Sequence, residues 1–110
     1  MAEEIKSEVP DALELRPAVD ILESGDGVKI VFEVPGANAK TVDVEVDHGV
    51  LKMTARSSLC RNGRPVIYQR AFQLSDAVDV EHITAKTADG ILTLNLPKSE
   101  RATVHKITVE

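Results

Sequence analysis

Leucine alternates with polar residues in the stretch Asp89-Gly90-Ile91-Leu92-Thr93-Leu94-Asn95-Leu96-Pro97. A period of two places Leu92, Leu94 and Leu96 on one face of an extended chain and the polar residues on the other. The Asp-Gly pair before them suits a two-residue hairpin turn, because both residues accept the positive φ angles that this turn needs. The stretch therefore predicts a half-buried strand that begins at a tight hairpin.

Three further stretches show the same alternation, namely Val28–Val34, Val42–Asp47 and Leu51–Arg56. Turn residues separate them, at Ser24–Gly27, Pro35–Asn38, Asp47–Gly49 and Asn62-Gly63. Helical spacing does not compete over these windows, and no stretch predicts a long helix. We therefore expect an all-β fold, an immunoglobulin-like antiparallel β-sandwich of about seven or eight short strands.

Length and composition limit the possible functions. The 110 residues fit one domain with a hydrophobic core of its own, since 43% of them are apolar. The formal net charge of -5 is unfavourable for binding nucleic acid or anionic lipid, and three aromatic residues are few for stacking bases. The apolar runs are far shorter than the ~20 residues of a membrane span. We expect neither a nucleic-acid partner nor a membrane span.

The single cysteine and the first residues bear on the compartment. Cys60 cannot form an internal disulfide, and we expect it to be a passive thiol. The beginning of the chain is acidic and has no apolar segment behind a basic start, which is not typical of a signal peptide. A cytoplasmic, reducing location is the resulting prediction.

No group of residues predicts a reaction centre. His48, His82 and His105 have no metal-ligand spacing and no cysteine partner, so surface imidazoles are expected. The glycines stand singly in turns rather than in a phosphate-binding loop. We therefore predict that the protein is not an enzyme and has no cofactor, metal or catalytic residue.

Arg70 interrupts an otherwise apolar set of positions, because in an extended chain it lies on the same face as Tyr68 and Phe72, from which it is spaced by two residues. If that face is covered, a buried guanidinium would need a carboxylate partner, with two hydrogen bonds where the geometry allows. If the face is open at this point, the arginine simply reaches water. Parity alone does not separate the two interpretations.

The chain divides into a short acidic arm (1–16), a sandwich domain (17–98) and a tail (99–110). We expect the arm to be flexible or weakly helical. In the tail, Ile107 and Val109 flank Thr108 and point the same way in an extended chain. They could add to an exposed sheet edge, with their side chains in pockets, or form a terminal strand of this chain's own sheet.

Several of these residues resemble the α-crystallin domain of small heat shock proteins. The stretch Pro17–Glu23, followed by Phe32-Glu33-Val34-Pro35-Gly36, is similar to the opening of that domain, and Val44–Leu51 is similar to its next hairpin. The strongest match is Ile83–Lys98, with its Ala85, Gly90-Ile91-Leu92 and final Leu96-Pro97-Lys98. Arg70 and the Ile107-Thr108-Val109 tail also match family features.

The resemblance implies a function and a set of sites. It implies an ATP-independent chaperone (a holdase) that binds partly unfolded clients, assembles with copies of itself and suppresses aggregation under stress. It implies that Arg70 is an ion-pairing residue near a dimer seam and that Ile107 and Val109 anchor the tail in a groove of a neighbouring subunit. The candidate groove residues are Val42, Val44, Val46, Ile83 and Ala85; the sequence does not settle which face of the strands forms the groove.

Two departures from the family pattern shape the expectations. Only about nine residues, Ser57–Pro65, link the strand ending at Arg56 to the one starting at Val66, so we expect a direct hairpin rather than a swapped strand. The arm is also shorter and more acidic than is usual in the family. An alternative function is a co-chaperone adaptor that docks on a larger ATP-driven chaperone, but that class usually lacks both the Leu-Pro-Lys run and the Ile-x-Val tail.

Overall fold

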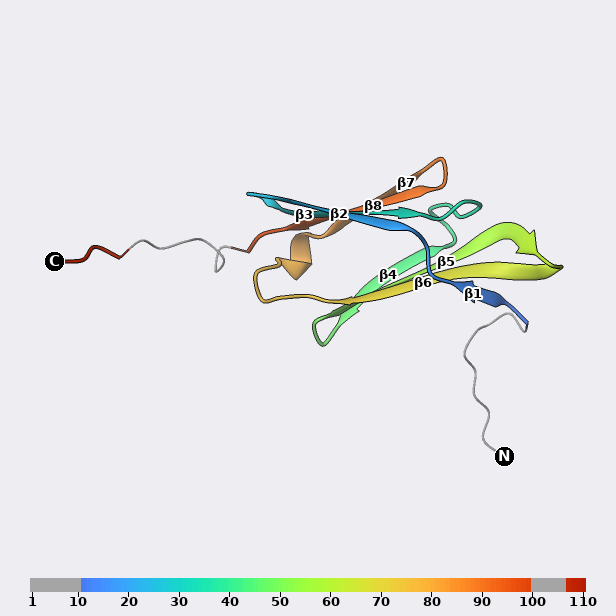
Figure 1. The fold of residues 1–110 in the computed structure, drawn as a ribbon, viewed down its shortest axis with the longest axis horizontal. Helices are drawn as coiled ribbons and strands as arrows, with labels where there is room; N and C mark the ends of the chain where they lie inside the picture. Colours follow the sequence, from blue (N-terminus) through green and yellow to red (C-terminus); the bar gives the residue numbers. More distant parts are fainter. Residues whose placement is uncertain (1–10, 100–106) are drawn as a thin grey trace, which may run out of the picture.

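The computed structural model describes residues 11–99 and 107–110, and in it two four-stranded sheets pack face to face (Figure 1). The first sheet has the order β1-β6-β5-β4 and the second the order β2-β3-β8-β7. The strands are β1 (Leu13–Leu15), β2 (Val19–Ser24), β3 (Gly27–Glu33), β4 (Val42–Asp47), β5 (Val50–Arg61), β6 (Arg64–Gln73), β7 (Thr84–Ala88) and β8 (Ile91–Pro97). One 3-10 turn, η1 (Val80–His82), precedes β7. The predicted all-β sandwich is confirmed.

Tight turns set the order of the strands. The β4–β5, β5–β6 and β7–β8 hairpins each turn over two residues, and in each turn both residues have positive φ: 51° and 78° at His48-Gly49, 54° and 74° at Asn62-Gly63, and 53° and 78° at Asp89-Gly90. These angles match the turn whose twist fits the right-handed twist of the flanking strands. The turns that the sequence predicts at these positions are confirmed.

The core lies between the sheets and consists of the residues that the alternation places on one face. Ile30 and Phe32 of β3 pair with Leu94 and Leu92 of β8, and all four are buried. Tyr68 also points inward, and its hydroxyl donates a hydrogen bond to the Pro35 carbonyl at 3.3 Å. Among the described residues, the buried cluster between the sheets consists of Ile30, Phe32, Val34, Ala37, Leu51, Met53, Ala55, Val66, Tyr68, Leu92, Leu94 and Leu96.

The β5–β6 hairpin is longer than the sequence predicts. The nine-residue loop expected at Ser57–Pro65 is wrong: β5 continues to Arg61 and β6 begins at Arg64. The register shifts between Arg56 and Cys60, which marks a β-bulge, and a bulge interrupts the period-two pattern on which the prediction depended. Ser57 lies within the bulged segment and comes very close to Gly36. A Cβ atom at position 36 would collide with the Ser57 hydroxyl.

The arm also departs from the prediction. Part of the segment expected to be flexible or weakly helical forms β1, which pairs in parallel with β6 through Leu13–Val66, Glu14–Ile67 and Leu15–Tyr68. Leu15 packs against the core, which gives this three-residue strand an apolar anchor. Residues 1–10 of the arm lie outside the described residues.

Candidate functional site

Arg70 lies on the inner face of β6, directly opposite the fully buried Met53. Its side chain is half-buried, and its Cζ atom lies 5.1 Å from the centre of the Phe72 ring, a cation–π contact. The Nε atom is buried and has no hydrogen-bond partner. No carboxylate within residues 11–99 and 107–110 pairs with this guanidinium, so the predicted ion pair is not formed inside the described chain.

A pocket of about 330 Å³ lies beside this arginine, where the chain leaves β1. Its lining includes three cations, Arg16, Lys52 and Arg70, and one carboxylate, Glu14. A buried charged donor without a partner costs more than the ~1–3 kcal/mol of a neutral one. The pocket is therefore suited to a carboxylate supplied by another polypeptide.

The outer edge of β6 is covered along only part of its length. The partner strand β1 spans Val66–Tyr68, and within the described residues no strand pairs with the outer edge of Gln69–Gln73. Unpaired backbone N–H and C=O groups on a sheet edge can accept another strand. The open part of the edge lies next to Arg70 and its pocket.

The candidate groove residues of β4 point inward. Val42, Val44 and Val46 lie opposite Ala55, Met53 and Leu51, three fully buried residues of β5, and all three valines pack against the core. They remain partly exposed because β4 is the last strand of its sheet. The structure thus settles which face of β4 carries the apolar row.

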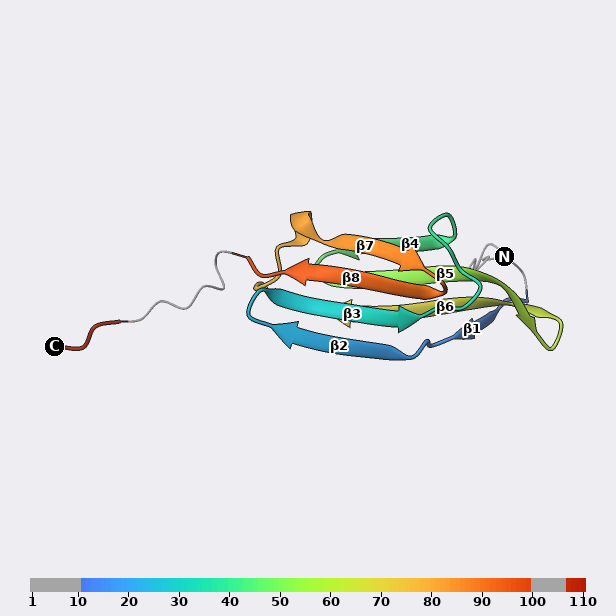
Figure 2. The same cartoon turned by 90° about the horizontal axis from the view of Figure 1, so that it is seen from above.

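The second set of groove candidates lies on and before β7, the last strand of the other sheet. Figure 2 shows β4 and β7 at the same side of the sandwich, one in each sheet. Ile83 packs against the core, and Ala85 faces inward opposite Leu94 but stays exposed. Thr87 lies opposite Leu92 on the same face and continues this row, and its spacing of two from Ala85 is the sequence signal for it.

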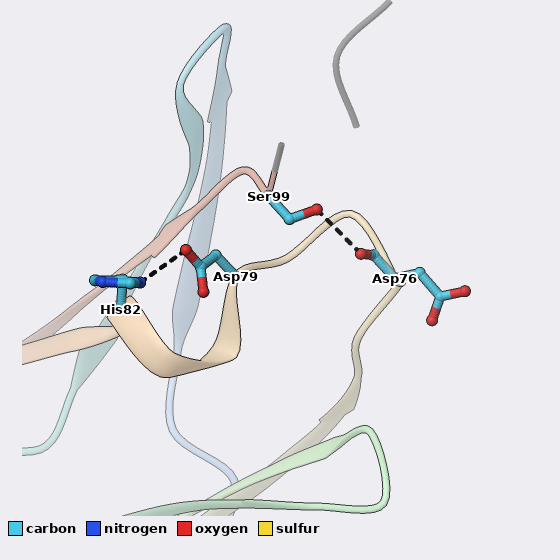
Figure 3. Close-up of polar contacts among 4 residues, drawn as sticks. All are labelled: Asp76, Asp79, His82 and Ser99. Atoms are coloured by element: carbon cyan, nitrogen blue, oxygen red, sulfur yellow. Dashed lines mark hydrogen bonds and ion pairs between the residues drawn. The ribbon is translucent and has the colours of Figure 1, made fainter. Parts of the chain in front are cut away.

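The base of the tail is fixed to the sandwich, while its anchor residues are exposed. The Ser99 backbone N–H donates to the Ala77 carbonyl at 2.7 Å, and its hydroxyl donates to the Asp76 carbonyl at 3.3 Å (Figure 3). Ile107 and Val109 are 86% and 90% exposed, and residues 107–110 belong to no strand of either sheet. The interpretation of Ile107–Val109 as a terminal strand of this chain's own sheet is therefore wrong.

The remaining candidates lie apart from one another on the surface. The His48 ring nitrogen Nδ1 lies 2.8 Å from the Asp47 carboxylate, and that of His82 lies 2.8 Å from the Asp79 carboxylate (Figure 3). Cys60 is an exposed free thiol on β5. Within the described ranges, no group of three or more His, Cys, Asp or Glu residues could hold a metal ion. His105 lies outside those ranges.

Fold and surface together define a β-sandwich protein whose candidate sites are strand edges and a tail. A search of solved structures gives the same fold: a small heat-shock protein from Xylella fastidiosa, described as having a distinct high-order structure, has a TM-score of 0.68 and 25% identity, covering 87% of this chain and 97% of that one. Heat shock protein 16.0 from Schizosaccharomyces pombe has a TM-score of 0.67 and 24% identity, covering 96% and 82%.

Sequence comparisons agree. The 18 kDa antigen 2 of Mycobacterium avium is 33% identical, in an alignment that covers 86% of this chain and 76% of that protein. The 18 kDa heat shock protein of Streptomyces albus is 26% identical, spanning 83% and 71%. The family model "Hsp20/alpha crystallin family" matches residues 20–110. The chain belongs to this family, which confirms the resemblance, and its membership gives it a chaperone role.

No helix among the described residues is long and apolar enough to cross a membrane.

Proposed function

We propose that this chaperone is an ATP-independent holdase, which binds exposed apolar segments of partly unfolded proteins and suppresses their aggregation. The observation that carries the proposal is the side of the sandwich where β4 and β7 end the two sheets. There the inward-facing Val42, Val44 and Val46 stay partly exposed beside backbone edges to which no strand of residues 11–99 and 107–110 pairs. An extended client segment can add to such an edge and place alternate side chains on the valine row.

The action proposed is passive. A protein that binds the unfolded state lowers the concentration of free unfolded chains by mass action, which slows their association with one another. The formal charge of -5 helps to keep the resulting complexes in solution. ATP independence is supported by the placing of the glycines, which lie in turns between strands or, for Gly27, at the start of β3, not in a loop before a helix.

The experiment is a light-scattering assay with a thermolabile enzyme as client. We expect scattering at the denaturing temperature to fall as the chaperone-to-client ratio rises, with and without ATP. A matched amount of an unrelated acidic β-sandwich protein is the control. Undiminished scattering across all ratios, or suppression only with ATP, would overturn the proposal.

Assembly with further copies is part of the proposal. We infer that Arg70 completes its hydrogen bonding at a dimer seam, where a carboxylate of a second copy enters the cationic pocket. We also infer that Ile107 and Val109 of a neighbouring copy lie on the apolar row of β4 and β7. A dimer formed by strand edges rather than by a swapped strand agrees with the two-residue turn of the β5–β6 hairpin. A cytoplasmic location remains a prediction from the sequence.

The alternative is an adaptor that docks on a larger ATP-driven chaperone. The intact Leu92–Lys98 run and the exposed Ile107-Thr108-Val109 segment favour the holdase. A pull-down under native conditions distinguishes the two functions. A single stoichiometric ATP-driven chaperone in the eluate would favour the adaptor, whereas a mixture of heat-labile proteins that rises with temperature supports the holdase.

A further inference from the structure

The charges of this chain are distributed unevenly between its strands. The stretch Val50–Leu74, which contains the β5–β6 hairpin, has five basic residues and no acidic one. The remaining 85 residues have eight basic and 18 acidic residues. The stretch Val50–Leu74 therefore has a formal charge of +5, and the rest of the chain has a formal charge of -10. The end of this hairpin extends beyond β3 and β8 (Figure 2). Its basic residues are Lys52, Arg56, Arg61, Arg64 and Arg70.

One acidic segment of the chain already occupies the edge of this hairpin. The strand β1 reads Leu13-Glu14-Leu15, and Glu14 lies beside Ile67 on the outer face, in the same row as Arg56. At the tip, Arg64 donates from Nε to the Asp11 carbonyl at 2.8 Å and from Nη2 to the Ala12 carbonyl at 3.2 Å. The contacts of Arg64 are to backbone oxygens, so they are open to any extended segment whatever its side chains.

The hold of β1 on this edge is weak. The strand has three residues, all of them at least partly exposed, and only Leu15 packs against the core. The two hydrogen bonds from Arg64 to the Asp11 and Ala12 carbonyls (the Arg64 clasp) are exposed to water, where each adds only about 0.5–1.5 kcal/mol to stability. Where β1 ends, the open edge of Gln69–Gln73 and the cationic pocket continue the same surface. A longer segment of similar chemistry could therefore use more of the edge than β1 does.

We propose that the β6 edge of this hairpin, in a subunit whose edge is not paired with a second copy, is a binding site for extended client segments in which apolar and acidic residues alternate, and that β1 occupies part of it as an internal ligand. The inference rests on the chaperone function proposed above and names a client class for it. The positive hairpin attracts an acidic segment, and the negative remainder directs such a segment away from the other edges. A basic segment meets repulsion at the same place.

The experiment measures binding of labelled peptides to the full chain by fluorescence anisotropy. Three peptides of about twelve residues alternate leucine with glutamate, glutamine or lysine; the first two have nearly the same shape and differ in charge, and the third reverses the charge. We expect the glutamate peptide to bind about tenfold more tightly than the glutamine peptide, and the lysine peptide to bind most weakly. The difference should shrink as salt rises from about 50 to about 500 mM, because these charges are exposed. Equal affinities for the three peptides would overturn the proposal.

Matched variants locate the site. Lys52→Gln with Arg61→Gln removes two exposed cations from the hairpin, and Lys29→Gln with Lys86→Gln removes two exposed cations from β3 and β7. We expect the hairpin pair to weaken binding of the glutamate peptide about fivefold and the control pair to leave it within twofold. Equal losses in both pairs would contradict a site on the hairpin.

A third variant tests the role of β1. Leu13→Ser weakens β1 without touching the core cluster, so it should raise affinity for the glutamate peptide about threefold, since a larger fraction of the edge is open. Unchanged or lower affinity would contradict β1 as a competitor. The client-aggregation assay, run on the same preparation, separates the two proposals. Suppressed aggregation without peptide discrimination removes only this inference, and unsuppressed aggregation removes the holdase proposal itself.

Discussion

The two edges of the first sheet carry opposite charge. At one edge, β4 alternates inward valines with Asp43, Glu45 and Asp47 on the outer face. At the other edge, β6 carries Arg64 and Arg70, and the acidic β1 covers part of it. Two β4 strands cannot pair without setting carboxylates near one another, so the acidic row disfavours pairing of this edge with the β4 strand of a second copy. One sheet can thus present two edges that select different partners.

The largest expected effect comes from removing the apolar row of the acidic edge. Val44→Asp puts a carboxylate opposite the fully buried Met53, and it should lower the free energy of unfolding by about 2–4 kcal/mol. Urea denaturation measures the loss. The neighbouring Asp43→Asn faces outward and should stay within about 0.5 kcal/mol of the parent protein. Equal stability of the two variants would show that the row does not face the core in solution.

At the basic edge, Arg70→Met separates stability from association. The change removes a buried donor that has no partner and keeps an apolar side chain against Phe72, so the isolated subunit should be about 1 kcal/mol more stable. The proposed dimer should dissociate about tenfold more readily, because its ion pair is lost. Denaturation at low concentration and sedimentation equilibrium measure the two effects. An unchanged dimer would exclude Arg70 from the seam.

The next prediction tests the acidic edge by removing the tail segment that is proposed to bind it. Deletion of residues 107–110 should reduce any assembly above a dimer to the dimer and leave the melting temperature of the sandwich unchanged, since Ile107 and Val109 are exposed in the single chain. Sedimentation velocity follows the change in size. Thr108→Ala keeps both anchors and is the matched control. Large assemblies that persist after the deletion would contradict the tail as their link.

The smallest effect concerns the clasp on β1. Arg64→Gln removes two hydrogen bonds to the Asp11 and Ala12 carbonyls, and hydrogen exchange in Leu13–Leu15 should quicken about fivefold. The matched variant Arg61→Gln lies across the same turn and should leave exchange in β1 unchanged. Equal exchange rates in the two variants would mean that Arg64 does not hold the arm.

The sequence predicts the parts of the fold that depend on local pattern. Leu92, Leu94 and Leu96 are buried as their alternation requires, and the turns at His48-Gly49, Asn62-Gly63 and Asp89-Gly90 form where His, Asn or Asp, followed by Gly, accepts positive φ. The extension of β5 is not predictable in this way, because the bulge after Arg56 breaks the alternation.

The features of the candidate sites that the sequence does not predict depend on contacts between residues far apart in the chain. The strand β1 has no local signal, since its pairing with β6 and its clasp by Arg64 join segments about fifty residues apart. Parity correctly places Arg70 beside Tyr68 and Phe72, but it cannot show that Nε lacks a partner. Alternation predicts an apolar row at Val42, Val44 and Val46, but only the register with β5 shows that this row lies opposite Ala55, Met53 and Leu51 at the edge of the sheet.

The most direct test of two edges with different partners is hydrogen exchange with one peptide bound at a time. One peptide carries the tail sequence Lys106–Glu110, and the other alternates leucine with glutamate. We predict that the tail peptide slows exchange in β4 and β7, and that the acidic peptide slows it in Gln69–Gln73 of β6. Protection of the same strands by both peptides, or of neither edge, would contradict the account.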